Sequence, residues 1–187
     1  MKFNKHSELE GAHAFLSPSS YHWVNYEEDK LAKTYLRHLA AARGTRLHAF
    51  ASEAIELGIR LDDTKDTLNL YINDAIDLGM TPEVVLYYSP NAFGTTDAIS
   101  FDDGFLRIHD LKTGDSRVSM TQLKVYNALF CLEYDIRPTD IEAELRIYQS
   151  RKVLVDTADP HEISYIISKI VEFDYQIQQI RKEHYDA

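Results

Sequence analysis

The chain has 187 residues, of which 44% are hydrophobic and 27% charged, and its formal net charge is −10. This length and composition suit one globular domain with a single core, and they exclude a disordered chain. The acidic balance argues against a general nucleic-acid coat protein, whose surface is usually basic. It does not exclude an enzyme that confines its phosphate contacts to one groove.

Cysteine content and hydropathy narrow the class of protein further. The single cysteine, Cys131, excludes an internal disulfide framework and any zinc or iron–sulfur site built from several cysteines. There is no apolar run of about 18 residues and no charged-then-apolar leader, so we expect neither a membrane span nor a signal peptide. These features favour the reducing cytoplasm.

The first helix-start signal is Ser-Pro-Ser at residues 17–19, because serine caps helices and proline suits a first turn. Trp23 follows it, and we expect this side chain to anchor a core. Residues 28–42 are helical in composition and are predicted to end before Gly44. The apolar stripe of that helix comprises Leu31, Tyr35, Leu36 and Leu39.

A second helix is predicted over residues 44–58, with Thr45 as its cap and Gly58 at its end. His48 shares a helix face with Ile55 and is therefore expected to point inward. A lone histidine on an apolar face is more often a core residue than a metal ligand. The residues alone leave the role of His48 open.

An amphipathic helix over residues 64–79, in which we see no chemistry, precedes a strand over 81–88 that is rich in β-branched and aromatic residues. Two further strands are predicted around a turn at Asp102-Asp103-Gly104, and a loop follows at Thr113-Gly114. A helix then brings Gln122 and Tyr126, spaced i, i+4, onto one face above the strand ends.

The strand that follows the turn carries an unusual face. Because strand side chains alternate, Asp110 and Lys112 continue the apolar face of Ile108. Charges on such a face need partners or a function, since their burial is costly. Asp97 would lie beside Asp110 if the two strands pair, and two carboxylates near a lysine form a site for a hard divalent cation. A surface hairpin with a simple Asp–Lys pair is the alternative.

The C-terminal part is predicted to contain one strand and one long helix. The segment 141–149 alternates strictly and is expected to place one face on the core. A helix from Asp159 to about Tyr185 has an isoleucine-rich face that we expect to turn inward. That face comprises Ile163, Ile166, Ile170, Phe173, Ile177 and Ile180. No repeat or linker is found, so we predict one domain over residues 1–187.

Three short motifs follow one another in a known order and spacing: Gly94-Thr-Thr-Asp97, Asp110-Leu-Lys112 and Gln122-Leu-Lys-Val-Tyr126. In these residues the chain resembles the PD-(D/E)XK nuclease superfamily, and within it the RecB-like and lambda-exonuclease-like phage branch. The resemblance implies an α/β fold with a restriction-endonuclease-like core, which is a small mixed β-sheet flanked by α-helices. It covers about residues 13–150 and leaves the helix over about 159–185 outside.

The resemblance also implies a catalytic set and a metal set. The catalytic set is Asp97, Asp110, Lys112, Gln122 and Tyr126. The metal set, for one or two Mg²⁺ or Mn²⁺ ions, is His48, Asp97, Asp110 and the carbonyl of Leu111. The metal would activate water for phosphodiester hydrolysis, Lys112 would orient or deprotonate that water, and Gln122 and Tyr126 would position the phosphate.

The roles of two further acids, Glu53 and Glu83, stay open. Relatives often carry an acid one turn after the histidine, but that position is Ser52 here, and Glu53 lies about 100° further round the helix. Glu83 either corresponds to an acid that relatives frequently place on the first core strand or is a polar strand end. The stretch 13–26 resembles the opening of some relatives in which a cysteine helps to hold an iron–sulfur cluster. Tyr26 stands at that cysteine's position, so we expect no cluster.

The function implied by the resemblance is a metal-dependent DNA nuclease, most simply an exonuclease of DNA recombination, repair or phage DNA processing. It would act in the cytoplasm of a bacterium or of a phage-infected host cell. The resemblance allows a recombination or single-strand annealing protein as partner, and a homo-oligomer. The alternative is an inactive member that serves as a binding or assembly subunit. Candidates for phosphate contacts are Arg43, Arg46, Arg117, Lys124, Arg146, Arg151 and Lys152.

Overall fold

A computed structural model describes residues 4–9, 11–115 and 117–185. The chain forms two compact units, residues 1–45 and 46–187, which we describe separately. The interpretation as one domain stays a prediction. Within the described residues, no helix has the length and apolar character that crossing a membrane requires.

The first unit contains two short 3-10 helices, η1 (Ser7–Leu9) and η2 (Pro18–Asn25), and the beginning of helix α1 (Glu28–Glu56). The predicted helix start at Ser-Pro-Ser is confirmed, because η2 begins at Pro18. Trp23 is half-buried, and its indole N–H donates to the carbonyl of Ser17 at 2.9 Å. The predicted apolar stripe on α1 is exposed to solvent along its length: Leu31, Tyr35, Leu36 and Leu39.

Helix α1 is longer than the sequence predicted. It continues through Gly44 and Thr45, so the predicted end before Gly44 and the predicted cap at Thr45 are wrong. The Thr45 hydroxyl instead donates to the carbonyl of Ala41, one turn earlier, at 3.2 Å. Glycine inside a helix costs only about 1 kcal/mol relative to alanine, which continued backbone hydrogen bonding outweighs. The predicted end at Gly58 is confirmed, and Gly58 has the positive φ of +64° that closes many helices.

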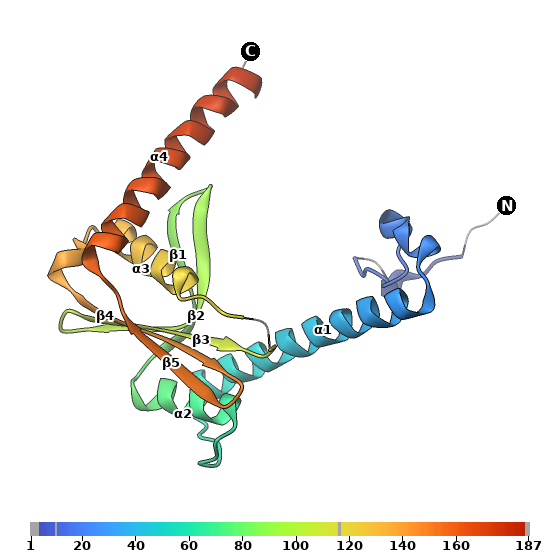
Figure 1. The fold of residues 1–187 in the computed structure, drawn as a ribbon, viewed down its shortest axis with the longest axis horizontal. Coiled ribbons are helices and arrows are strands. Elements are labelled where there is room, and N and C mark those ends of the chain that lie inside the picture. Colours follow the sequence, from blue (N-terminus) through green and yellow to red (C-terminus); the bar gives the residue numbers. More distant parts are fainter. Residues whose placement is uncertain (1–3, 10, 116, 186–187) are drawn as a thin grey trace. The chain divides into compact units, whose positions relative to one another are not determined.

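The second unit is built on one five-stranded sheet with the order β1-β2-β3-β4-β5. The strands are β1 (Thr81–Ser89), β2 (Ala92–Asp102), β3 (Phe105–Lys112), β4 (Glu142–Gln149) and β5 (Lys152–Thr157). Strands β3 and β4 pair in parallel, and every other neighbouring pair is antiparallel. A parallel pair needs a crossover, which helix α3 (Thr121–Glu133) supplies (Figure 1).

Two tight turns explain one successful and one missed prediction. The turn predicted at Asp102-Asp103-Gly104 is confirmed. Asp102 pairs with Phe105, so the turn itself has two residues, Asp103 and Gly104, both at positive φ. Strand β5 was not predicted. It follows a similar turn in which Ser150 and Arg151 have φ of +49° and +63°. Neither residue is the asparagine or glycine that usually marks such a turn, so the sequence carried no hairpin signal there.

Helices cover both faces of the sheet. Helices α3 and α4 (Pro160–Tyr185) pack on one face, while α2 (Thr67–Asp77) and the last turns of α1 contribute to the core on the other. The predicted mixed α/β fold with a flanked mixed sheet is therefore confirmed. Strand β4 was expected to place one face on the core, but its opposite face is covered too. Tyr148 there is fully buried, and its ring lies 5.4 Å from that of Tyr71 on α2.

Only the first half of α4 turns its isoleucines inward. Ile163 is buried, and Ile166 and Ile170 pack on the core as predicted. The same prediction is wrong for the second half, where Phe173, Ile177 and Ile180 are 51%, 38% and 53% exposed. A 26-residue helix is about 39 Å long. It therefore extends past the layer on which it packs (Figure 1).

Candidate metal centre

The candidate site lies where β2 and β3 separate. Their pairing ends at Ala98 and His109. Beyond that pair the Asp97 side chain replaces the missing strand partner, because its Oδ2 accepts a hydrogen bond from the N–H of Leu111 at 2.7 Å. Asp97 and Asp110 lie on the same face of their strands as Ile99 and Ile108, as the alternation predicted. This local opening of the ladder leaves room for two carboxylates at one strand end.

Asp110 is nearly fully buried, with 3% of its surface exposed. Burial raises the pKa of its carboxyl group, and the neighbouring charge of Asp97 raises it further. Lys112 opposes this effect, because its Nζ lies 3.0 Å from Oδ1 and 2.9 Å from Oδ2 of Asp110. Asp110 and Lys112 therefore pair, but the buried carboxylate of Asp110 does not fit the surface hairpin that was the alternative. The raised pKa shows that one lysine does not compensate for burial and for the second carboxylate.

Glu83 joins the site from β1 through an unusual backbone conformation. Its neighbours Pro82 and Val84 pair with Ala98 and Thr96, which places Glu83 opposite Asp97. Glu83 has φ of +52°, a region that non-glycine residues rarely occupy and that costs energy. Burial and the charge of Asp97 raise the pKa of the Glu83 carboxyl group. Strain of this kind occurs preferentially at functional sites, so the structure favours the functional alternative for Glu83.

His48 reaches the same carboxylates from helix α1. Its Nδ1 lies 3.4 Å from Oδ1 of Asp97, and its ring is partly exposed. The hydrogen bond to Asp97 raises the pKa of His48, burial lowers it, and the negative charges of Asp97, Asp110 and Glu83 raise it further. His48 is thus not a core residue among apolar neighbours. Its imidazole instead lies beside the carboxylates of Asp97, Asp110 and Glu83.

His48, Glu83 and Asp97 together have the geometry of a cation site. One ligand atom of each lies within 4.8 Å of the others. A single ion with bonds of about 2.0–2.6 Å can contact ligands at such separations. One imidazole nitrogen and carboxylate oxygens suit Mn²⁺ and also accept Mg²⁺, although these donors do not identify the ion. The residues present therefore fit a divalent cation, with Glu83 in the group and Asp110 beside it.

A chain of polar contacts links the acids to helix α3. Lys112 Nζ donates to Oε1 of Gln122 at 3.0 Å. The Gln122 amide lies 3.5 Å from the hydroxyl of Tyr126, which donates to the carbonyl of Thr95 on β2. The structure thus brings Lys112, Gln122 and Tyr126 together as predicted. They form a continuous network that ends on the strand carrying Asp97.

The glycine of the first motif has a packing role. A Cβ added at Gly94 would lie 3.0 Å from Cε1 of Tyr126, which is tighter than nine in ten real Cβ contacts. Glycine therefore lets the aromatic ring lie directly on the backbone of β2. This close approach also places the Tyr126 hydroxyl within reach of Thr95. The first residue of the Gly-x-x-Asp motif and the last residue of the Gln-x-x-x-Tyr motif therefore contact each other.

Other predicted residues fall in different places. Leu111 touches the site through its N–H, and the metal-binding role of its carbonyl stays a prediction. Glu53 is exposed and is not part of the group of possible ligands formed by the described residues. Tyr71 on α2 was missed. It is buried, and the charges of Asp97, Glu83 and Asp110 add to burial in raising its pKa. Nothing in the amphipathic pattern of α2 distinguished it from a core aromatic residue.

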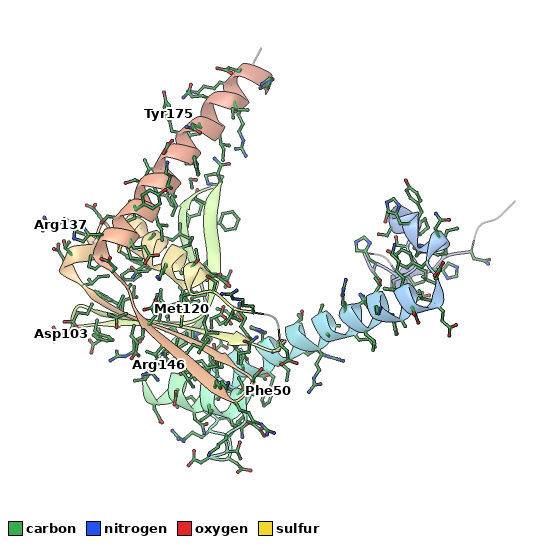
Figure 2. The ribbon with its side chains drawn as sticks, in the orientation of Figure 1. Phe50, Asp103, Met120, Arg137, Arg146 and Tyr175 are labelled. Atoms are coloured by element: carbon green, nitrogen blue, oxygen red, sulfur yellow. The ribbon has the colours of Figure 1, made fainter. Side chains whose placement is uncertain are left out.

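The basic side chains proposed for phosphate contacts lie in different surroundings. One of them, Arg117, lines a pocket beside the acids, together with His48, Lys112, Ser119 and Gln122. Three others pair with acids elsewhere: Lys124 with Asp156 and Glu162, Arg146 with Asp74 and Glu144, and Arg151 with Asp66. Figure 2 labels Arg146 on β4. Arg151 nevertheless lies close to the candidate site, because it lines a second pocket with Leu111 and Lys112.

Comparison of the chain with protein-family models, curated proteins and solved structures finds no match. The assignment of the site therefore depends on the residues and on their geometry.

Proposed function

We propose that the chain is a divalent-metal-dependent deoxyribonuclease with a restriction-endonuclease-like core, related to the RecB-like and lambda-exonuclease-like phage nucleases. The main support is the meeting of Asp97, Asp110 and Lys112 at one strand end, beside His48 and Glu83. These residues come from helix α1 and from three strands, and a chance surface hairpin would not bring them together. Mg²⁺ or Mn²⁺ is the proposed cofactor.

In the proposed mechanism His48, Glu83 and Asp97 would hold the cation, with Asp110 as a further ligand. The bound cation would lower the pKa of water and offset the charge that grows on the phosphate in the transition state. Lys112 is held between Asp110 and Gln122, so its ammonium group can orient the attacking water and a phosphate oxygen. Water adds to phosphorus, the bond to the leaving oxygen breaks, and a phosphomonoester and a free hydroxyl result.

The pocket next to the acids suits the neighbouring phosphate of the substrate strand. It measures about 440 Å³ and brings Arg117, Lys112 and Ser119 to one opening. Arginine and lysine neutralise phosphates, and a hydroxyl adds a donor. We propose an exonuclease of DNA recombination, repair or phage DNA processing in a bacterial or phage-infected cytoplasm. The exonuclease activity, the cellular setting and a recombination or single-strand annealing protein as partner all depend on the resemblance.

The second candidate is a catalytically inactive subunit that binds a protein or DNA. Two observations favour it: the net charge of −10, and the pairing of Lys124, Arg146 and Arg151 with acids. Each ion pair removes a cation from the set that could contact phosphate. The intact Asp97, Asp110 and Lys112 argue in the other direction.

A cleavage assay separates the two candidates. Purified protein with Mn²⁺ or Mg²⁺ is incubated with linear duplex, closed circular duplex and single-stranded DNA, and with a chelator as control. We expect loss of linear DNA while the circles stay intact. Cutting of the circles would indicate an endonuclease with the same chemistry. No cutting with either metal would contradict the nuclease proposal and favour the binding subunit.

A further inference from the structure

Helix α2 contributes a buried phenol that the mechanism proposed above does not use. Tyr71 is 2% exposed and belongs to the core cluster on the α2 side of the sheet. Two other members of that cluster are sequence neighbours of the acids. Ala98 directly follows Asp97 on β2, and its burial continues the core there. Leu111 directly follows Asp110 on β3. Tyr71 therefore lies in the part of the core that adjoins the strand ends carrying the acids.

The ring of Tyr71 is held in a defined position. It packs edge-on against the ring of Tyr148, with 5.4 Å between the ring centroids and an angle of 75° between the planes. Tyr148 is the β4 partner of Leu111 in the parallel pairing with β3. The N–H of Leu111 in turn donates to the carboxylate of Asp97 at 2.7 Å. A short series of fixed contacts thus connects the Tyr71 ring with the carboxylate of a proposed metal ligand.

The hydroxyl of Tyr71 lies within electrostatic range of the site. Burial raises the pKa of this phenol, and the negative charges of Asp97, Glu83 and Asp110 raise it further. The phenol is therefore protonated at ordinary pH. A neutral hydroxyl can both donate and accept a hydrogen bond.

This hydroxyl makes no hydrogen bond to the part of the chain that the structure describes. The adjacent hydroxyl of Tyr148, in contrast, donates to Oδ2 of Asp74 at 2.7 Å. Buried hydroxyls normally have a partner, because the hydrogen bonds to water that they lose on folding are costly to leave unmade. A buried hydroxyl that adjoins three acids and is not used by the protein itself is suited to a small polar ligand of the site.

We propose that Tyr71 is a positioning residue of the metal centre, whose hydroxyl hydrogen-bonds to water held by the divalent cation. The inference rests on the proposed function, because it needs a cation bound by His48, Glu83 and Asp97. Magnesium takes about six ligands and usually keeps several waters when a protein binds it. Water bound to a cation is a strong hydrogen-bond donor, and the phenol oxygen of Tyr71 accepts from it. This bond fixes the direction of the water relative to the acids.

Calorimetric titration of the full chain with Mn²⁺ tests the proposal with two matched variants. Each variant removes one buried hydroxyl under α2 and keeps the aromatic ring. Tyr71→Phe should weaken Mn²⁺ binding by about tenfold or more, because partners of the metal's own ligands contribute on that scale. Tyr148→Phe should bind Mn²⁺ like the wild-type protein, since its hydroxyl is bonded to Asp74.

Urea unfolding without metal should give the opposite ranking. Tyr148→Phe should lower the midpoint, because Asp74 loses a donor and Nδ1 of His109 loses a neighbour at 3.3 Å. Tyr71→Phe should leave the midpoint unchanged or raise it, because its hydroxyl has no bond to the described chain to lose. Added Mn²⁺ should then raise the midpoint of Tyr148→Phe more than that of Tyr71→Phe.

The outcomes separate this inference from the proposed function. If the wild-type protein binds Mn²⁺ and Tyr71→Phe binds it equally well, the role of Tyr71 is overturned and the metal centre stands. Equal weakening in both variants would assign the loss to the core beneath α2 and would likewise overturn the role of the Tyr71 hydroxyl. A wild-type protein that binds no Mn²⁺ would overturn the metal centre and this inference with it.

Discussion

The Asp97 carboxylate accepts a hydrogen bond from the backbone N–H of Leu111 at 2.7 Å. This bond closes the gap that appears where β2 and β3 separate after the pair Ala98 and His109. It uses one oxygen of Asp97 and leaves the other to approach His48 at 3.4 Å. A side chain that takes the place of a strand partner is thereby held at a defined position, as a metal ligand needs to be.

The first prediction concerns metal affinity. Glu83→Gln should weaken Mn²⁺ binding by at least about tenfold, because it removes an anionic ligand from the group with His48 and Asp97. Calorimetric titration measures this. The metal-free variant should be as stable as the wild-type protein or more stable, since the repulsion from Asp97 that raises the pKa of Glu83 is lost. Glu53→Gln, on an exposed acid of α1, is the control and should bind normally. Unchanged affinity in Glu83→Gln would remove Glu83 from the site.

The second prediction separates catalysis from metal binding. Lys112→Ala should reduce DNA cleavage by about 10²–10⁴-fold, because the group that orients water and phosphate is lost. Mn²⁺ binding should persist, since Lys112 is a cation and competes with the metal for Asp110. Asp110→Ala should abolish cleavage while the fold persists. Lys65→Ala, on an exposed loop lysine, should cleave like the wild-type protein. Full activity in Lys112→Ala would refute its assignment.

The third prediction concerns the contact between two of the motifs. Gly94→Ala adds a Cβ that would lie 3.0 Å from the Tyr126 ring, so the ring must move away from β2. Overpacking of this kind typically costs about 1–3 kcal/mol. We expect a lower denaturation midpoint and, because Tyr126 loses its bond to Thr95, weaker cleavage. Combining Gly94→Ala with Tyr126→Leu should restore much of the stability but not the activity. Unchanged stability in Gly94→Ala would show that the ring adapts without cost.

The fourth prediction is a pH dependence of stability at the β1–β2 turn. The hydroxyl of Ser89 and the amide of Asn91 hold the pKa of Asp174 below its usual range. A carboxyl group whose pKa is lower in the folded than in the unfolded protein stabilises the fold above the unfolded pKa of about 3.9. This stabilisation is lost as the pH falls through the folded pKa.

Urea unfolding of the wild-type protein and Asp174→Asn measures this effect. The wild-type protein should be the more stable at neutral pH, because asparagine offers one acceptor oxygen to three donors. The difference should shrink below about pH 4. Glu172→Gln, an exposed acid on the same helix, should show a much smaller difference throughout. A difference that persists unchanged to low pH would contradict the role of the ionised carboxylate.

Much of the fold could be predicted because its signals are local. Alternation identified β3 and β4, Asp103-Gly104 identified a hairpin turn, and Gly58 identified a helix end. The predictions failed where tertiary contacts or backbone strain determine the local structure. A continuous α1 overrides Gly44, and the turn at Ser150 and Arg151 uses residues that seldom adopt positive φ, so β5 had no sequence signal.

The sequence by itself determined which chemistry is available, because the spacing of Asp97, Asp110, Lys112, Gln122 and Tyr126 assigns each to a strand end or a helix face. Only the tertiary structure decided which other groups join them. Glu83 enters because β1 pairs with β2 and its backbone turns at that point, while Glu53 points into solvent. The exposure of Phe173, Ile177 and Ile180 on α4 was likewise hidden, since a periodic apolar face has the same sequence pattern whether or not the core covers it. Apolar periodicity indicates which face of a helix favours burial. Only the packing in three dimensions shows which part of that face the chain itself covers.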